Sequence, residues 1–325
     1  MRSLITSILF AAIASVASAQ SLRGPVESFT FDAPTGSLRA VNGFPGSATF
    51  GPALLSDVEF GSVAPHQNYA IAFQDGHWLV VSGLDSGHAS TAPLAGVFGK
   101  PEGAVWSGDG SVAILYSRSE NWIQTLTSLP KSPHADAYLN LSALAGSLTA
   151  VASDADGKQI AIAMHGPKGG VYLNTSKQEF IPLAKIANPI ALSFSENAAN
   201  LYVLDGTALK LTAITISDWN SEALPLAGLR DPFTILAGYD SANRPVLFVA
   251  SGTDRLVGVY NPASQKMETT IHLGFQPTGL QDFGRNSLVI GSRSKAESPL
   301  WLFSTAPNPA VYFVPAVQAA AKGDE

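Results

Sequence analysis

Cysteine is absent from this 325-residue sequence, and charged residues are scarce, at 14% of the chain. Without cysteine there is no disulfide framework, no thiolate nucleophile and no cysteine-ligated zinc site. The formal net charge of −6 gives no basic footprint for nucleic acid, so we expect no nucleic-acid partner. Hydrophobic residues make up 46% of the chain, which is enough to bury a large core and argues against disorder. The fold must therefore be held together by its core alone.

Long apolar runs are also lacking beyond the N-terminus, where no segment reaches the roughly 18 residues of a transmembrane helix. Residues 1–19 have the layout of a signal peptide: Arg2 supplies the positive charge, residues 4–14 form a short apolar region, and Ala-Ser-Ala at 17–19 is a cleavage site. We predict cleavage before Gln20, with an uncleaved anchor as the alternative. The mature protein is then expected to be exported, to the periplasm or the cell exterior, with no remaining membrane span.

Glycine and proline are abundant, with 29 and 21 residues, and recur too often for a mature segment to hold a long helical stripe. Short apolar runs lie between them. The stretch 103–129 shows the plan, because Gly-Ala-Val-Trp-Ser turns at Asp109-Gly110 and returns as Ser-Val-Ala-Ile-Leu-Tyr. An Asp-Gly pair between two apolar runs is a strong hairpin signal. This stretch is therefore predicted to form successive strands of one sheet.

The same plan recurs at turns spaced about 42–47 residues apart, a period typical of four-stranded propeller blades. The turns are at residues 65–67, 109–110, 156–157, 197–198, 241–242 and 284–285. The runs 112–115, 160–163 and 246–250 are continuously apolar, as expected for strands covered on both faces. The sequence therefore predicts an all-β propeller of four-stranded antiparallel blades.

We expect one propeller domain over residues 20–316, with six blade repeats in 55–316 and a flexible tail at 317–325. Residues 28–54 are predicted to form an N-terminal hairpin and link, in which 28–42 look like the two outer strands of a further unit. That hairpin either decorates a six-bladed ring or forms a thin seventh blade. Six blades are the favoured count and seven the alternative.

Repeats of this length, with a proline before each strand–turn–strand unit, resemble exported bacterial propeller repeats of the YVTN and NHL type. The segments Gly-Phe-Pro-Gly-Ser-Ala (43–48), Pro-Leu-Trp-Leu-Phe (299–303) and Phe-Val-Pro-Ala (313–316) resemble an uncharacterised group among them. The resemblance covers about residues 28–316. It implies the fold and little about activity, because propellers have many unrelated functions. The Tyr-Val-Thr-Asn motif itself, a Trp-Asp dipeptide at strand ends and the sialidase-type Ser-x-Asp-x-Gly box are missing.

A propeller brings the links between blades and the turns between second and third strands to one face, here called the link face. The turns between first and second strands lie on the opposite turn face. Much of the scarce charge falls on the link face, and we predict a ligand-binding surface there. Its candidate residues are His77, Glu102, Arg118, His165, Asp231, Arg255 and Arg293. The alternative is that these loops are polar only because they are solvated.

No sequence motif for catalysis is present: there is no nucleophile elbow, no phosphate-binding glycine loop and no helical pair of histidines. We therefore expect no catalytic residue, resident metal or cofactor, and interpret the chain as an exported binding or scaffold module. Its partner is expected to be a protein, a peptide or a glycan. The alternative is a metal-dependent hydrolase or lactonase, with its ion held where His77, His165, Glu102 and Asp231 converge at the channel mouth. A third interpretation is a purely structural spacer.

Overall fold

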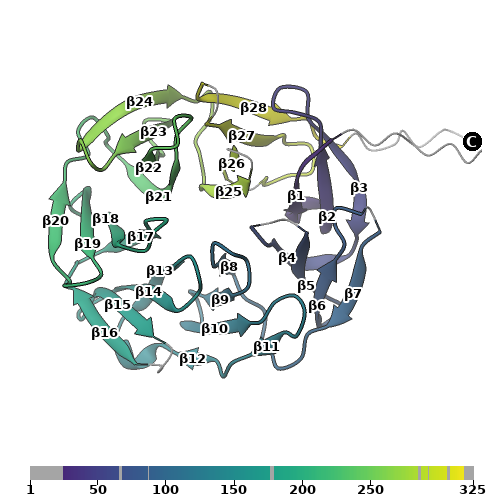
Figure 1. The fold of residues 1–325 in the computed structure, drawn as a ribbon, viewed down its shortest axis with the longest axis horizontal. Coiled ribbons are helices and arrows are strands. Elements are labelled where there is room, and N and C mark those ends of the chain that lie inside the picture. The colour runs from purple at the N-terminus through teal and green to yellow at the C-terminus, as the bar shows by residue number, and fades with distance from the viewer. Residues whose placement is uncertain are drawn as a thin grey trace, which may run out of the picture.

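The computed structural model describes residues 25–65, 68–86, 88–175, 179–284, 287–291, 293–305 and 308–317. The predicted signal peptide and residues 318–325 of the predicted tail lie outside this part of the chain. Within it, the strands form seven antiparallel sheets around a central axis, one blade per sheet (Figure 1). The predicted all-β propeller is confirmed, and the count is the alternative of seven blades rather than the favoured six.

Blade 1 is three-stranded and contains one 3-10 turn: β1 (Val26–Asp32), η1 (Ala33–Thr35), β2 (Ser37–Asn42) and β3 (Thr49–Leu55). Blade 2 is β4 (Val58–Val63), β5 (Tyr69–Gln74), β6 (His77–Ser82) and β7 (Ser90–Pro93). Blade 3 is β8 (Gly103–Trp106), β9 (Ala113–Ser117), β10 (Trp122–Thr127), β11 (His134–Ala135) and β12 (Leu139–Asn140). Its outer edge is split, because β11 and β12 both pair with β10.

The remaining blades have four strands each. Blade 4 is β13 (Ser147–Ser153), β14 (Gln159–His165), β15 (Gly170–Thr175) and β16 (Phe180–Ala184), preceded by the 3-10 turn η2 (Ser142–Leu144). Blade 5 is β17 (Pro189–Phe194), β18 (Asn200–Asp205), β19 (Lys210–Thr215) and β20 (Ser221–Leu224). Blade 6 is β21 (Pro232–Tyr239), β22 (Pro245–Ser251), β23 (Leu256–Asn261) and β24 (Lys266–His272). Blade 7 is β25 (Gln281–Gly284), β26 (Ser287–Val289), β27 (Leu300–Ser304) and β28 (Ala310–Val314). No helix among the described residues is long and apolar enough to cross a membrane.

In blades 3 and 5, the turn between first and second strands is stabilised by its own side chains. In blade 3, the Ser107 hydroxyl accepts a hydrogen bond from the Val112 amide at 3.0 Å, and Asp109 accepts one from the Ser111 amide at 2.9 Å. The residue three positions after Ser107 is Gly110, whose φ of 73° favours glycine. Blade 5 repeats the scheme with Ser195 in the place of Ser107. These local bonds explain why the turn spacing was readable in the sequence.

The blades are held together by seven apolar clusters, one at each interface between neighbouring blades. Strand β22 shows the reason for the continuous apolar runs, since residues 246–251 are buried throughout. One side of each such strand faces the preceding blade and the other the following blade. Burying a single large aliphatic side chain contributes about 1.5–3 kcal/mol, so the interfaces dominate the stability.

Blade 1 lies in the ring with its inner strand reversed. Only two residues separate the end of β3 from the start of β4. Because blade 1 has three strands instead of four, β1 runs in the opposite direction to the other inner strands. Two hydrogen bonds are consistent with this direction of β1. The Val58 amide donates to the Gly36 carbonyl at 2.8 Å, and the Ser28 hydroxyl donates to the Phe283 carbonyl at 2.7 Å. The end of β1 therefore lies beside the start of β4, and the start of β1 beside the end of β25.

This placement corrects the prediction that residues 28–42 form outer strands. β1 is the innermost strand of its blade, and the strand that blade 1 lacks is the outermost (Figure 1). Like the other inner strands, β1 lines the channel, and Phe29 and Phe31 pack against blade 2. Among the described strands, no sheet combines the two ends of the chain, so blades 1 and 7 are joined through side chains and loops.

Candidate functional site: the central channel and the link face

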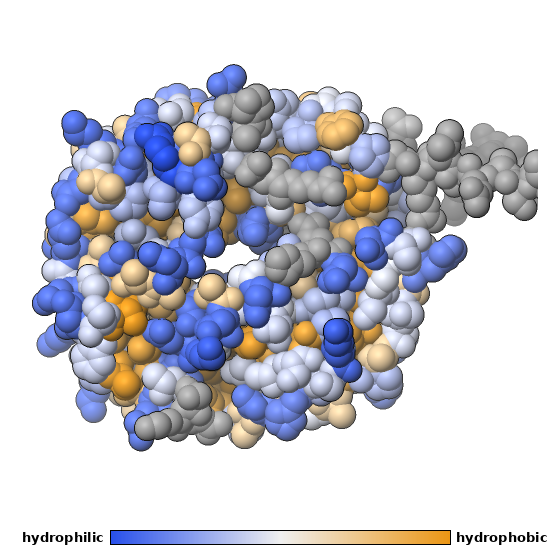
Figure 2. All heavy atoms as spheres, in the orientation of Figure 1, coloured by the Kyte–Doolittle hydropathy of each residue, from blue (hydrophilic) through white to orange (hydrophobic). Residues whose placement is uncertain are grey.

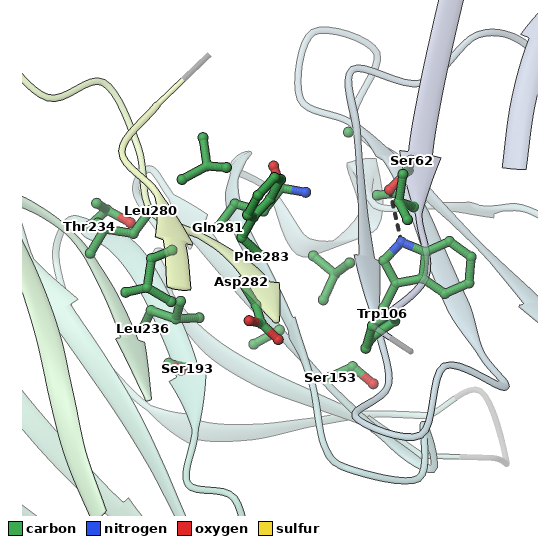
Figure 3. A pocket seen from close by; sticks show the side chains of 18 of the residues that line it. Ser62, Trp106, Ser153, Ser193, Thr234, Leu236, Leu280, Gln281, Asp282 and Phe283 are labelled. Carbon is green, nitrogen blue, oxygen red and sulfur yellow. Dashed lines mark hydrogen bonds between the residues drawn. The ribbon is translucent and has the colours of Figure 1, made fainter. Parts of the chain in front are cut away.

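The inner strands of all seven blades surround a cavity of about 970 Å³ along the ring axis. Figure 2 shows a hollow at the centre of the molecule with hydrophilic residues around its rim. Inside, Leu236, Leu280 and Phe283 provide apolar wall, while Ser153 and Ser193 contribute hydroxyls (Figure 3). A cavity of this size with a few polar groups on apolar walls is typical of small-molecule or peptide binding.

Part of the wall is fixed by a bond between blades. The Trp106 indole N–H donates to the Ser62 hydroxyl at 2.8 Å, joining blade 3 to blade 2 in the wall of the cavity (Figure 3). The Trp106 ring also packs edge-on against Tyr69, with ring centroids 5.7 Å apart. These contacts join blades 2 and 3 at this part of the wall.

Two of the seven predicted link-face residues line this cavity, Glu102 and Arg293. Glu102 precedes β8 and holds the turn between β9 and β10. Its carboxylate accepts hydrogen bonds from the Ser119 amide at 2.7 Å and the Ser117 hydroxyl at 3.2 Å, and it pairs with Arg118 at 3.4 Å. The hydrogen bonds from Ser119, with those from Ser117 and Arg118, lower the pKa of Glu102 to about 2. The structure thus brings Glu102 and Arg118 together as a pair within one blade.

Asp231 plays the equivalent part in blade 6. It precedes β21, and its carboxylate accepts hydrogen bonds from the Thr253 amide at 3.1 Å and hydroxyl at 2.8 Å. Beside it, Arg230 donates to Asp254 at 2.6 Å, and hydrogen bonds from the Arg230 amide, Ser251 and the Arg230 side chain lower the pKa of Asp254 to about 2. Carboxylates at the links therefore fix the neighbouring turns, a role that spacing in the sequence does not reveal.

The three remaining link-face candidates lie apart from the cavity wall. The His165 ring contacts the Ala187 carbonyl at 3.2 Å, while His77 and Arg255 are exposed in the turns of blades 2 and 6. The described residues contain no group of three or more histidine, aspartate or glutamate side chains placed to hold a metal ion. The convergence of His77, His165, Glu102 and Asp231 that the hydrolase alternative requires is therefore not found.

Arg293 was predicted to take part in ligand binding on the link face, and the structure buries it at 8% exposure. Its guanidinium donates to Asp32 at 2.6 Å and to the Ser298 carbonyl at 2.6 Å, and lies 4.8 Å above the centre of the Phe50 ring. Asp32 also lies 3.6 Å from Arg39. Sequence reasoning placed Arg293 in a polar turn and had no means of detecting a partner in the first blade.

Three carboxylates that sequence reasoning missed line the cavity toward the turn face: Asp154, Glu196 and Asp282. Burial against the channel wall raises the pKa of Glu196, and the negative charge of Asp282 raises it further, although Glu196 as a residue stays exposed. Asp282 projects into the pocket from β25 (Figure 3). Asp154 and Glu196 stand at the ends of the neighbouring inner strands β13 and β17. The interaction of Glu196 with Asp282, two blades away, left no motif in the sequence.

No protein-family model matches the chain, and no curated protein matches it in sequence. Several solved structures share its fold. A chain of a nidogen/laminin complex is 15% identical, with a TM-score of 0.52 over 78% of this chain and 95% of that one. Hydrazine synthase of Kuenenia stuttgartiensis is 12% identical, with a TM-score of 0.54 over 77% of each chain. A functionally unknown protein from Desulfotomaculum acetoxidans is 14% identical, with a TM-score of 0.50 over 78% of each. At these identities the likeness concerns the fold alone, which is a β-propeller.

Proposed function

We propose that this protein is an exported, non-catalytic propeller that binds a protein, peptide or glycan on its link face, around the channel opening. The observation that carries the proposal is that carboxylates on this face accept hydrogen bonds from the neighbouring turns and so fix their conformation. Glu102 in blade 3 and Asp231 in blade 6 each hold the adjacent turn by two or more hydrogen bonds. A preformed rim loses little conformational entropy when a partner binds, which favours affinity.

The side chains available to a ligand are those that form no hydrogen bond or ion pair within the rim. The side chains of His77 and Arg255 are exposed and, within the described chain, form no hydrogen bond or ion pair. They stand on blades 2 and 6, on different sides of the channel (Figure 1). A ligand reaching both would cross the channel opening, which suits an extended peptide or a glycan chain.

Two further observations support this proposal. The repeats resemble exported bacterial propellers of the YVTN and NHL type, and the N-terminal residues have the layout of a signal peptide. A similar fold also occurs in a chain of a nidogen/laminin complex, which is an assembly of proteins. The first observation favours export, and the second favours a recognition module.

The binding proposal is tested with the purified mature chain on peptide and glycan arrays, followed by calorimetry on the strongest ligands. The double variant His77→Ala/Arg255→Ala should weaken binding at least tenfold, since a hydrogen bond to a charged group contributes about 1.5–3 kcal/mol. Lys266→Ala, which removes an exposed charge at the start of β24, is the matched control and should bind normally. Equal affinity of the double variant and the control would refute the link-face assignment.

Export is tested separately by expressing the complete sequence in a Gram-negative host and fractionating the cells. The N-terminal residue of the periplasmic or secreted form should be Gln20. Intact protein that keeps Met1 in the cytoplasmic fraction would contradict the proposed export.

A further inference from the structure

The link face of blades 4 and 5 carries three exposed lysines that form no ion pair with any described residue: Lys168, Lys185 and Lys210. These three residues are here called the lysine patch. Lys168 lies in the turn between β14 and β15, Lys185 in the link between the two blades, and Lys210 at the end of the turn between β18 and β19. Asp205 is the one acidic residue in these three segments. This part of the link face is therefore positive, although the chain has a formal net charge of −6.

Contacts between the three segments bring the lysines onto one surface. The link between the blades touches the turn on either side of it. The His165 ring contacts the Ala187 carbonyl at 3.2 Å, and the Gly206 amide donates to the Asn188 carbonyl at 2.9 Å. Blades 4 and 5 are neighbours in the ring (Figure 1). The lysine patch is therefore a continuous feature of the folded chain, although its members come from three separate segments of the sequence.

Leu209 provides a second, independent observation beside the patch. Its side chain is 39% exposed, and its backbone is left-handed, with a φ of 48°. That conformation is unfavourable for a leucine, because its Cβ crowds the backbone. The turn is held in place by Asp205, whose carboxylate accepts hydrogen bonds from the Thr207 and Ala208 amides at 2.8 and 3.1 Å. An exposed apolar side chain kept in an unfavourable backbone conformation points to a role in recognition.

We propose that the lysine patch and Leu209 bind an acidic peptide segment of a partner protein, in which an apolar side chain stands between carboxylates. The carboxylates pair with the lysines, and the apolar side chain packs against Leu209. This partner is a more specific form of the one proposed above, so the assignment rests on the proposed function. Arg255, in the neighbouring blade 6, is also exposed on the link face, and it extends the positive surface beyond the patch.

The chemistry of the patch favours a peptide over an anionic glycan. Lysine ammonium groups are point charges on flexible stems, so they suit carboxylates that are spread along a chain. Bidentate recognition of a phosphate or sulfate group is typical of arginine, and the three segments contain none. A sulfated or phosphorylated glycan would also leave Leu209 unused, whereas a peptide can place an apolar residue against it.

Calorimetry on the purified mature chain tests the proposal with two acetylated and amidated peptides, Glu-Glu-Leu-Glu-Glu and Glu-Glu-Ser-Glu-Glu. The leucine peptide should bind, more tightly than the serine peptide. Both affinities should fall as the salt concentration rises, since salt screens charges at the surface. Absence of binding by the leucine peptide, or an affinity that does not depend on salt, overturns the proposal.

Charge variants locate the site. Lys168→Gln/Lys210→Gln should weaken binding of the leucine peptide about fivefold, because an exposed ion pair changes an affinity by only a few-fold. The matched control is Lys131→Gln/Lys266→Gln, which removes two exposed lysines of the turn face and changes the net charge equally. It should bind normally. Equal weakening in the two variants would show that the net charge alone matters, and would overturn the assignment to the patch.

Leu209→Asn separates recognition from folding. Asparagine adopts the left-handed backbone more readily than leucine, so the variant should melt no lower than the wild type. It should nevertheless weaken binding of the leucine peptide about threefold and leave the serine peptide unaffected, because only the leucine peptide loses an apolar contact. Equal effects on the two peptides, or no effect on either, would contradict the proposal.

A heparin hexasaccharide is the third probe and represents an anionic glycan. If it binds more tightly than the leucine peptide, and equally well to Leu209→Asn, the ligand is a glycan and the peptide proposal fails. Failure of this inference is distinguishable from failure of the proposed function. A ligand from the arrays that loses affinity in His77→Ala/Arg255→Ala, but not in the patch variant, would support the link face while overturning the lysine patch.

Discussion

Arg293 and Asp32 are 261 positions apart in the chain, yet the Arg293 Nη1 atom lies 2.6 Å from the Asp32 Oδ1 atom. Their side chains are 3% and 0% exposed. Arg293 belongs to blade 7 and Asp32 to the inner strand of blade 1, so this ion pair lies at the junction of the first and last blades. Because no described sheet spans that junction, the pair and the apolar cluster around Val41 and Leu302 close the ring.

Replacing Arg293 by methionine should destabilise the protein by about 3 kcal/mol, because a buried carboxylate that loses its partner is left uncompensated. Arg39, at 3.6 Å from Asp32, keeps the cost at the lower end of the usual range. Urea-induced unfolding followed by tryptophan fluorescence measures the change. The control is Lys100→Met, which breaks the exposed pair with Glu59 and should cost no more than about 1 kcal/mol. Similar losses in the two variants would mean that the junction does not depend on this pair.

Glu102 makes the stability depend on pH in the acidic range. Its pKa in the folded protein is about 2, below the ordinary value of 4.5, so the folded state favours the ionised carboxylate. This contribution is fully present above pH 4.5 and is lost as the pH falls toward 2. Because the side chain is about one-third exposed, we expect solvent screening to reduce the contribution to the order of 1 kcal/mol.

The corresponding experiment compares wild type with Glu102→Gln by urea unfolding between pH 2 and pH 7. The variant should be less stable at pH 7 and should approach the wild type near pH 2. Glu59→Gln, which removes the exposed partner of Lys100, should show a smaller difference at pH 7. A difference between wild type and Glu102→Gln that is constant with pH would exclude ionisation of Glu102 as its cause.

A pair of glycines separates backbone strain from packing between blades. Gly157 and Gly76 have nearly the same φ, 74° and 76°, so alanine at either position meets the same conformational penalty, about 1 kcal/mol. At Gly157 the added Cβ would also lie 2.6 Å from the Val112 side chain in blade 3, whereas at Gly76 nothing lies within 4 Å. Gly157→Ala should therefore lose about 1–3 kcal/mol more than Gly76→Ala in thermal or urea unfolding. Equal losses would show that Val112 moves aside freely.

Gln124 joins the outer part of blade 3 to the link that precedes it. It is 2% exposed, accepts a hydrogen bond from the Phe98 amide at 2.7 Å and donates to the Gly96 and Asp136 carbonyls at 2.9 and 2.8 Å. Gln124→Leu leaves these three backbone groups without their partner and should cost about 2–4 kcal/mol. Gln74→Leu, which removes one exposed bond to the Ser56 carbonyl, should cost less than about 1 kcal/mol. Hydrogen exchange at the Phe98 amide should also accelerate in Gln124→Leu, and unchanged protection there would contradict this role.

The blades could be predicted because their signals are local. The turn of blade 3 is closed by Ser107 and Asp109 through bonds to residues at most five positions away, so its position is set by neighbouring residues. The predicted apolar runs at 246–250 and 160–163 lie within β22 and β14. Burial on both faces leaves a direct trace in sequence, because such strands contain no polar alternation.

The candidate site was less predictable, because its residues meet through the ring. The sequence indicated that charge gathers at the links, but not that Glu102 and Asp231 use their charge to hold turns of their own blades. It also gave no sign that Glu196 and Asp282, two blades apart, face one cavity. Such pairs depend on how many blades complete the circle, and that number results from the sum of all the interfaces.

The sequence by itself determined an all-β chain, the turn positions and the apolar strands between them, since short-range hydrogen bonds and burial patterns set these features. Tertiary structure decided the rest. The reversal of β1, the seventh blade and the burial of Arg293 against Asp32 all require contact between the first and last blades. Contacts between residues so distant in the chain arise from closure of the ring, and local sequence patterns carry no information about them.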